Sequence, residues 1–263
     1  MELEKATYLG TNTHSYYADG ILISETAYHR KVFEGWHSHQ HPHITFIIEG
    51  GNQEQRKHRE QEVRPGEVLL YHSGERHRNK NTQHPSRNIN FEIESSFLDR
   101  YELDFSSLYQ GGTSSPGYKA GLLKIYRECC VNDVHTVSSI HALLLELFNI
   151  AQTPGKTTRI PQWAIRLQQL LHDTWDDTPS LTQLAAILQV HPVTISKYFP
   201  VYFSCTLGEY IRRIKVEKAV AYIKEPGSSL TEIAYRCGFT DQSHFIRTFR
   251  TATGFLPGEY KKM

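Results

Sequence analysis

One short pattern occurs twice in the C-terminal part of the chain. Ser-Leu-Thr-Gln-Leu-Ala occupies residues 180–185, and Ser-Leu-Thr-Glu-Ile-Ala occupies residues 229–234, 49 residues further on. In each copy a Ser is followed three residues later by Gln or Glu, so that each side chain can satisfy an unpaired backbone N–H at the start of a helix. A second amphipathic segment follows each copy after a break of three or four residues. The repeat therefore predicts helix, tight turn, helix, twice.

The first copy predicts a helix over 181–188 and a second helix from Pro192 to about Phe203. Proline suits the first position of a helix, where no partner is lost with its missing N–H. Three apolar residues of the second helix are expected to pack inward: Ile195, Tyr198 and Phe199. Its opposite face is short, mostly polar and suited to a groove: Val193, Thr194, Ser196 and Lys197. Pro200 leaves open whether this helix is kinked or shortened.

In the second copy, Gly238 supplies a left-handed turn and Asp241 can start a helix that ends near Gly254. Phe245 and Phe249 are expected to pack inward. The outward face is predicted to carry Gln242, Ser243, His244, Ile246 and Arg247. Glutamine and arginine are side chains that pair bidentately with adenine and guanine edges in the major groove.

A helix over 207–224 is expected to join the two copies. Its 18 residues at about 1.5 Å each give a rigid spacer of about 27 Å. With the helix widths added, this is comparable to the roughly 34 Å repeat between successive major-groove faces of DNA. Residues 159–263 also hold 13 Lys and Arg against 9 Asp and Glu, whereas the rest of the chain is net negative. Only the C-terminal part therefore suits a polyanionic partner.

The N-terminal part has a different period. Short apolar runs at 21–23, 44–48, 68–71 and 89–93 are separated by Gly- and Pro-containing turns, which predicts a mostly β region over about 7–94. Helical periodicity follows over about 117–151. The helix near 137–151 has more apolar surface than one contact uses, so we predict a homodimer interface there. The expected organisation is a domain at 1–152, a polar linker at 153–160 and an all-α domain at 161–263.

Four histidines alternate along the chain at positions 37, 39, 41 and 43. In an extended segment all four imidazoles point to one face, although Pro42 indicates a sheet edge or a turn there. His37-x-His39, His43, Gly50, Gly66, Gly74, His77 and Asn81 resemble the cupin pattern, a jelly-roll β-barrel. This sequence departs from the pattern at Lys31, at His43, where cupins usually have Glu, and at His72.

The cupin resemblance implies a site at His37, His39, His43 and His77. Three alternatives stay open for it: a divalent metal, an organic ligand pocket without metal, or no ligand role. No cofactor is required by the sequence. The four cysteines, which lack zinc-like spacing, are expected to be small buried hydrophobic residues.

The stretch 229–250, followed by Gly254, Pro257 and Tyr260, resembles the AraC/XylS family of transcription regulators, and the resemblance covers residues 160–262. It implies two helix-turn-helix motifs that bind double-stranded DNA, behind a cupin-like domain that binds a small-molecule effector. Base contacts are assigned to Val193, Thr194, Ser196, Lys197, Gln242, Ser243, His244 and Arg247. Phosphate contacts are assigned to Arg212, Arg213 and Arg250. Gln189 departs from the family, which usually has Gly at that turn.

The leading hypothesis is thus a transcription regulator and not an enzyme. The alternative is a metal-dependent cupin enzyme with an appended DNA-binding domain. No apolar run approaches the roughly 20 residues that span a bilayer, and residues 1–20 do not resemble a signal peptide. We therefore expect a cytoplasmic protein with no membrane partner.

Overall fold

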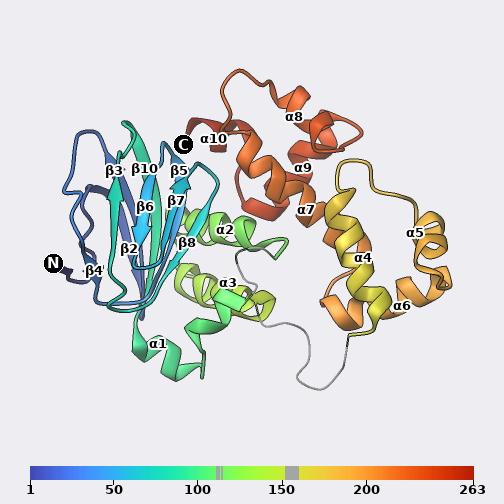
Figure 1. The fold of residues 1–263 in the computed structure, drawn as a ribbon, viewed down its shortest axis with the longest axis horizontal. Helices are drawn as coiled ribbons and strands as arrows, with labels where there is room; N and C mark the ends of the chain where they lie inside the picture. The colour runs from blue at the N-terminus through green and yellow to red at the C-terminus, as the bar shows by residue number, and fades with distance from the viewer. Residues whose placement is uncertain (111–112, 114, 152–159) are drawn as a thin grey trace.

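The computed structural model describes residues 1–110, 113, 115–151 and 160–263, with a β-rich half followed by a helical half (Figure 1). Most of the predicted linker therefore lies outside the described residues. The strands are β1 (Glu2–Leu3), β2 (Thr11–Ala18), β3 (Ile21–Tyr28), β4 (Ser38–His39), β5 (His43–Glu49), β6 (Asn52–Arg56), β7 (Arg59–Val63), β8 (Val68–Tyr71), β9 (His77–Lys80) and β10 (Ser86–Ile93). All four apolar runs that the sequence marked as strands lie in β3, β5, β8 and β10.

An antiparallel five-stranded sheet, in the order β2-β3-β10-β5-β8, forms the larger layer. A smaller sheet has the order β7-β6-β9, and β1 pairs with β4. Backbone bonds between His37 and His77 join the edge of β9 to the segment that leads into β4. Among the described residues these ladders do not close into the expected barrel, because the sheets share no strand and only the isolated bridge between His37 and His77 reaches from β9 toward β4.

The helical elements are α1 (Ser95–Arg100), the 3-10 helix η1 (Phe105–Gln110), α2 (Tyr118–Val131), α3 (Thr136–Ala151), α4 (Gln162–Asp173), α5 (Leu181–Leu188), α6 (Pro192–Phe203), α7 (Leu207–Tyr222), α8 (Leu230–Arg236), α9 (Gln242–Thr253) and α10 (Pro257–Lys262). Both predicted capping boxes are present, at Ser180 with Gln183 and at Ser229 with Glu232. The spacer helix α7 has 16 residues, two fewer than expected.

Apolar side chains form two large clusters that do not follow the predicted boundary between sensor and reader halves. One cluster begins in the larger sheet, passes through α2 and α3 and continues into α7, α8, α9 and α10. The other joins α4, α5 and α6 to the first half of α7. Figure 1 shows the same arrangement, with α2 near α7 and α9 while α5 and α6 lie far from the sheets. The second helix-turn-helix unit is therefore packed on the N-terminal half of the chain, the predicted sensor.

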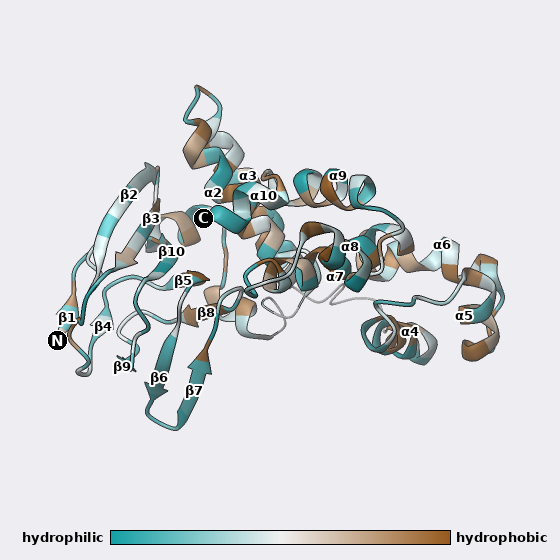
Figure 2. Cartoon of the chain, turned by 90° about the horizontal axis from the view of Figure 1, so that it is seen from above, coloured by the Kyte–Doolittle hydropathy of each residue, from teal (hydrophilic) through white to brown (hydrophobic). Residues whose placement is uncertain are grey.

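Figure 2, seen from above, shows both hydrophobic and hydrophilic residues on each of the larger helices, as amphipathic packing requires. Several sequence expectations need correction. Tyr198 is 41% exposed instead of packing inward, because the α6 core is already filled by Ile195 and Phe199. Ile246 packs partly against the core, and Cys130 is exposed while the other three cysteines are buried.

The structure answers whether Pro200 shortens α6. α6 runs through Pro200 without a break and ends at Phe203, so the first reader helix is not shortened.

In α3, Leu144, Leu147 and Phe148 are buried in the chain's own core, and Leu143 packs against the same cluster. Less apolar surface is therefore left for a dimer interface than the sequence suggested. The homodimer remains a prediction.

A carboxylate of α7 joins the two halves. Glu217 Oε1 accepts hydrogen bonds from the backbone N–H groups of Gly117 (3.1 Å) and Lys119 (2.9 Å) at the start of α2. Such N–H groups have no partner within their own helix, and the positive end of the helix dipole favours a carboxylate. Burial nevertheless raises the pKa of Glu217 to about 7, with nearby Lys119 opposing the shift.

The turn after α5 generates a stability prediction. Gln189 and Gly238 hold the same place in the two repeats, and both have left-handed backbones, with φ of 55° and 69°. Because a non-glycine residue pays about 1–2 kcal/mol there, Gln189→Gly should raise the free energy of unfolding by about 0.5–1 kcal/mol after the added chain entropy is subtracted. The matched change Gly238→Ala should lower it, since a Cβ would lie 2.3 Å from the Asp176 carbonyl oxygen. Urea unfolding measures both. Equal effects of the two changes would contradict this account.

Glu217 predicts a pH dependence. Its pKa is raised above the ordinary value of 4.5, so the folded protein keeps the proton longer than the unfolded chain. Stability should therefore fall by about 1–3 kcal/mol as pH rises from about 4.5 to about 7, and change no further above that. The other titratable side chains that interact with the Glu217 carboxyl are Lys119 and Tyr260. In Glu217→Gln the drop should shrink, as followed by urea unfolding at several pH values. An identical pH profile in the variant would count against the assignment.

Candidate ligand cavity and nucleic-acid interface

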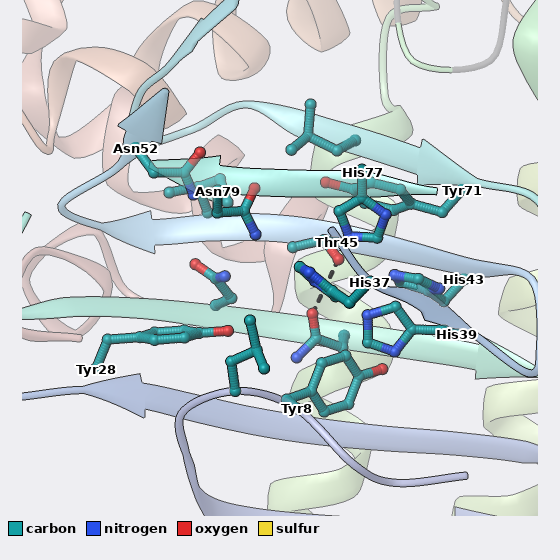
Figure 3. A pocket seen from close by; sticks show the side chains of 15 residues that line it. Tyr8, Tyr28, His37, His39, His43, Thr45, Asn52, Tyr71, His77 and Asn79 are labelled. Carbon is teal, nitrogen blue, oxygen red and sulfur yellow. Dashed lines mark hydrogen bonds between the residues drawn. The ribbon is translucent and has the colours of Figure 1, made fainter. Parts of the chain in front are cut away.

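A small cavity lies within the β-rich half. Its lining consists of uncharged side chains only: Tyr8, Leu9, Tyr28, His37, His39, His43, Thr45, Ile47, Asn52, Leu69, Tyr71, His77, Asn79, Asn88 and Asn90. Figure 3 shows the four imidazoles grouped together, with Asn52 and Asn79 further along the cavity. The volume is about 20 Å³, which suffices for a water molecule or a metal ion. An organic effector of ordinary size needs more room than this conformation provides.

The four histidines of the predicted site, at positions 37, 39, 43 and 77, all line this cavity, whereas His41 does not. The chain is not one continuous strand here, since β4 ends at His39 and β5 begins at His43. The expectation of one shared face is therefore wrong for His41, which lies in the turn that contains Pro42. His37, His39, His43 and His77 are each at most 5% exposed.

Backbone hydrogen bonds fix three of these imidazoles. The Nδ1 atoms of His37, His43 and His77 lie 3.1, 3.3 and 3.1 Å from the carbonyl oxygens of residues 35, 41 and 75. A carbonyl oxygen only accepts, so each Nδ1 carries the proton and each Nε2 keeps a free lone pair. This is the arrangement in which a histidine binds a metal, with its second nitrogen held by a backbone carbonyl.

Burial also keeps the imidazoles neutral. It lowers the pKa of His39 to about 4 and that of His77 to about 3, and it lowers the pKa values of His37 and His43 as well. Ligand nitrogens of His37, His39 and His77 all lie within 4.8 Å of one another. The His43 ring stands beside this group, with its centre 4.4 Å from that of His39. The residues present therefore fit a cation that takes neutral nitrogen ligands, such as zinc, copper or nickel.

The other part of the cavity is lined by carboxamides that the sequence interpretation missed. The Oδ1 atoms of Asn52, Asn79 and Asn88 are buried without a hydrogen-bond partner in the structure. Asn79 follows His77 by two residues on β9, and alternation on a strand places such residues on one face. That spacing could have indicated that Asn79 lies on the same face as His77. The spacing does not tell which face of the strand is buried, so only the packing of the sheets identifies the residues that line the cavity.

The first reader helix, α6, exposes most of its predicted contacts. Val193 is 62% exposed, and Ser196 and Lys197 are also exposed, while Thr194 is half-buried. His191 caps the helix by accepting from the Val193 N–H. The exposed ring of Tyr198 lies beside Lys197, which adds an aromatic side chain that sequence reasoning placed in the core.

The second reader helix, α9, begins at a cap where Asp241 Oδ1 accepts from the His244 N–H at 2.7 Å. Ser243 and Arg247 are exposed, and Gln242 is half-buried because its Oε1 accepts a bond from the Thr231 hydroxyl at 3.0 Å. Its amide N–H groups have no such bond and can still donate. The predicted contacts of α9 therefore lie together on one face.

Predicted DNA contacts from two helices meet in one groove between α7 and α9. This groove has a volume of about 500 Å³ and is lined by Glu209, Arg212, Arg213, Val216, His244, Arg247, Thr248, Thr251 and Ala252. Three arginines and a histidine line this groove with one carboxylate among them, and this excess of positive charge favours an anion. Arg250 is exposed but does not line the groove.

No helix in the described part of the chain is long and apolar enough to cross a membrane.

Comparison with known proteins places both halves. Residues 20–171 match the family described as AraC-like ligand binding domain, and residues 184–263 match a helix-turn-helix domain. Among curated proteins, the chain is 31% identical over 90 residues to the uncharacterized HTH-type transcriptional regulator YpdC of Escherichia coli, covering 34% of this chain and 32% of that protein. It is 25% identical over 134 residues to the HTH-type transcriptional activator RhaS of Escherichia coli, covering 50% of this chain and 48% of that one. These matches thus span a third to a half of the relatives' length.

Solved structures are more distant. Apo ToxT from Vibrio cholerae aligns over 93% of this chain and 97% of its own, with 13% identity and a TM-score of 0.38. The DNA-binding domain of AdpA, in complex with a target DNA, aligns over 39% of this chain and 92% of its own, with 19% identity and a TM-score of 0.37. The ligand-binding family match covers more than half of the sequence. With a β-rich half that matches the ligand-binding domain, two capped helix-turn-helix units and both family matches in the same order, the chain belongs to the AraC family of transcription regulators.

Proposed function

We propose that this protein binds specific DNA sequences through α6 and α9 and regulates transcription under the control of a ligand in the histidine cavity. The observation that carries the proposal is the outward face of α9, where Arg247 lies beside a groove that also holds Arg212 and Arg213. Phosphate neutralisation by these cations gives affinity that falls with salt, and base-edge contacts from Gln242 and Arg247 give specificity.

The distance between the readers supports the same function. The 16 residues of α7 extend about 24 Å, and the widths of the flanking helices add to this. Two reader helices at such a spacing suit successive major-groove faces, which repeat about every 34 Å. A homodimer through α3 would place four reader helices along one site.

Control by a ligand rests on the cavity. Its three grouped histidines are neutral, and His37 and His77 have their Nε2 lone pairs free, so a divalent transition metal is the ligand that this conformation favours. The unpartnered Asn oxygens favour a ligand or water that donates hydrogen bonds. A larger organic effector requires the cavity to open. A metal-dependent enzyme is the second candidate, favoured by the histidine group alone, whereas the curated relatives are named as regulators.

Arg247→Ala should weaken binding to the preferred sequence by about 1–3 kcal/mol, roughly 5- to 150-fold, and relax the preference at one base pair. The preferred sequence is found by selecting duplexes from a random library, and affinity is then measured by fluorescence anisotropy. Arg64→Ala is the matched control, because Arg64 is an exposed arginine paired with Glu62 on the β-rich half. If Arg247→Ala left both affinity and selected sequence unchanged, α9 would not be a base-reading helix.

Protein prepared without chelator should take up one Zn²⁺ or Ni²⁺ per chain, measured by elemental analysis and calorimetry. His39→Ala and His77→Ala should each weaken uptake by roughly tenfold or more, since each removes one nitrogen ligand. His58→Ala is the control, as His58 is exposed in the turn between β6 and β7. Metal should also change the affinity for the selected duplex if the cavity controls DNA binding. Uptake that is unaffected by either cavity variant would exclude this site.

A further inference from the structure

Arg213 lies where two hollows of the molecule meet. It lines the 500 Å³ groove between α7 and α9 together with Arg212 and Arg247. It also lines a cavity of about 190 Å³ between the sensor helices α2 and α3 and the reader half, together with Lys124 and Glu146. Thr251 and Ala252 of α9 belong to both hollows. One arginine is thus shared by the DNA-facing groove and the sensor interface.

The start of α2 lies over the face of α7 that carries this arginine. Arg213 and Glu217 are four residues apart, so they lie on the same side of the helix. Glu217 accepts from the backbone of Gly117 and Lys119. A Cβ added to Gly117 would come within 3.2 Å of Arg213 Cδ, which places the arginine stem directly against the turn before α2. The Glu217 contact therefore fixes the position of Arg213 next to the sensor.

A sensor carboxylate faces the arginine there. Glu146 Oε1 of α3 is 3.9 Å from an Nη atom of Arg213. Arg212, the neighbouring residue of α7, is exposed, lines the groove and makes no ion pair with another described residue. A carboxylate on one side of Arg213 and an anion-favouring groove on the other compete for the same guanidinium group.

We propose that Glu146 acts as an autoinhibitory stand-in for a DNA phosphate: while the sensor is docked on α7, Glu146 and DNA compete for Arg213. The inference rests on the proposed DNA binding and concerns its regulation. Arg213 then has two partners that exclude each other, and any ligand-driven shift of α3 changes the number of phosphates that the reader half neutralises. Because the pair is partly exposed, with side-chain accessibilities of 33% and 57%, its effect is modest.

The test uses the full chain and a fluorescein-labelled 40-base-pair duplex of random sequence, with affinity measured by anisotropy over a series of salt concentrations. Glu146→Gln should bind about two- to fivefold more tightly than wild type. The slope of log affinity against log salt should steepen by up to about 0.9, the value for one further phosphate contact. Glu60→Gln is the control, because it removes the same charge from an exposed position on β7.

A double variant separates the local effect from the general one. In an Arg213→Gln background, the gain from Glu146→Gln should disappear, since no guanidinium is left to release. Equal gains from Glu146→Gln and Glu60→Gln, or a gain that persists without Arg213, would overturn the inference while leaving DNA binding intact. Absence of any salt-dependent binding by wild type would instead overturn the proposed function, and this inference with it.

Discussion

The packing of α2 against α7 and α9 is the contact on which the rest of the structure depends. It extends one apolar core from the larger sheet to the second helix-turn-helix unit. Across the same contact, Glu217 satisfies two half-buried backbone N–H groups at the start of α2 that have no partner within their own helix. Breaking it would expose apolar surface and leave those groups unpaired, because the N-terminal half and the second helix-turn-helix unit share one core.

The two helix-turn-helix units consequently differ in more than sequence. The first has its own core, formed by α4, α5, α6 and the start of α7, and meets the second unit through α7 and through Trp175, which packs against both clusters. The second unit packs against α2 of the N-terminal half. The first unit also carries more backbone strain than the second. Gln189 occupies a left-handed turn that is unfavourable for a residue with a Cβ, whereas Gly238 adopts it at the equivalent position without that cost. The N-terminal half therefore packs mainly on the second unit, and the first unit is joined to the second by α7 and by the segment at Trp175 and Asp176.

Burial decides the chemistry of the histidine cavity. Imidazoles removed from water lose the charged form, and the backbone carbonyls beside His37 and His77 then choose which nitrogen carries the remaining proton. Neutral rings with free Nε2 atoms are ligands for a transition metal. The same rings with a charge would repel it. The described lining contains no carboxylate, so a group bound there would meet neutral donors alone.

The sequence by itself determined the local structure: both capping boxes, the strands at the four apolar runs, and the inward positions of Phe245 and Phe249, because capping and hydrophobic period act over a few residues. It also identified the cavity histidines, through their resemblance to the cupin pattern. Only the tertiary structure decided that His41 turns away, that the Asn residues join the lining, and that Tyr198 is exposed. The same holds for the docking of α2 and the place of Arg213 beside Glu146. These depend on contacts between residues far apart in the chain, which no local pattern encodes.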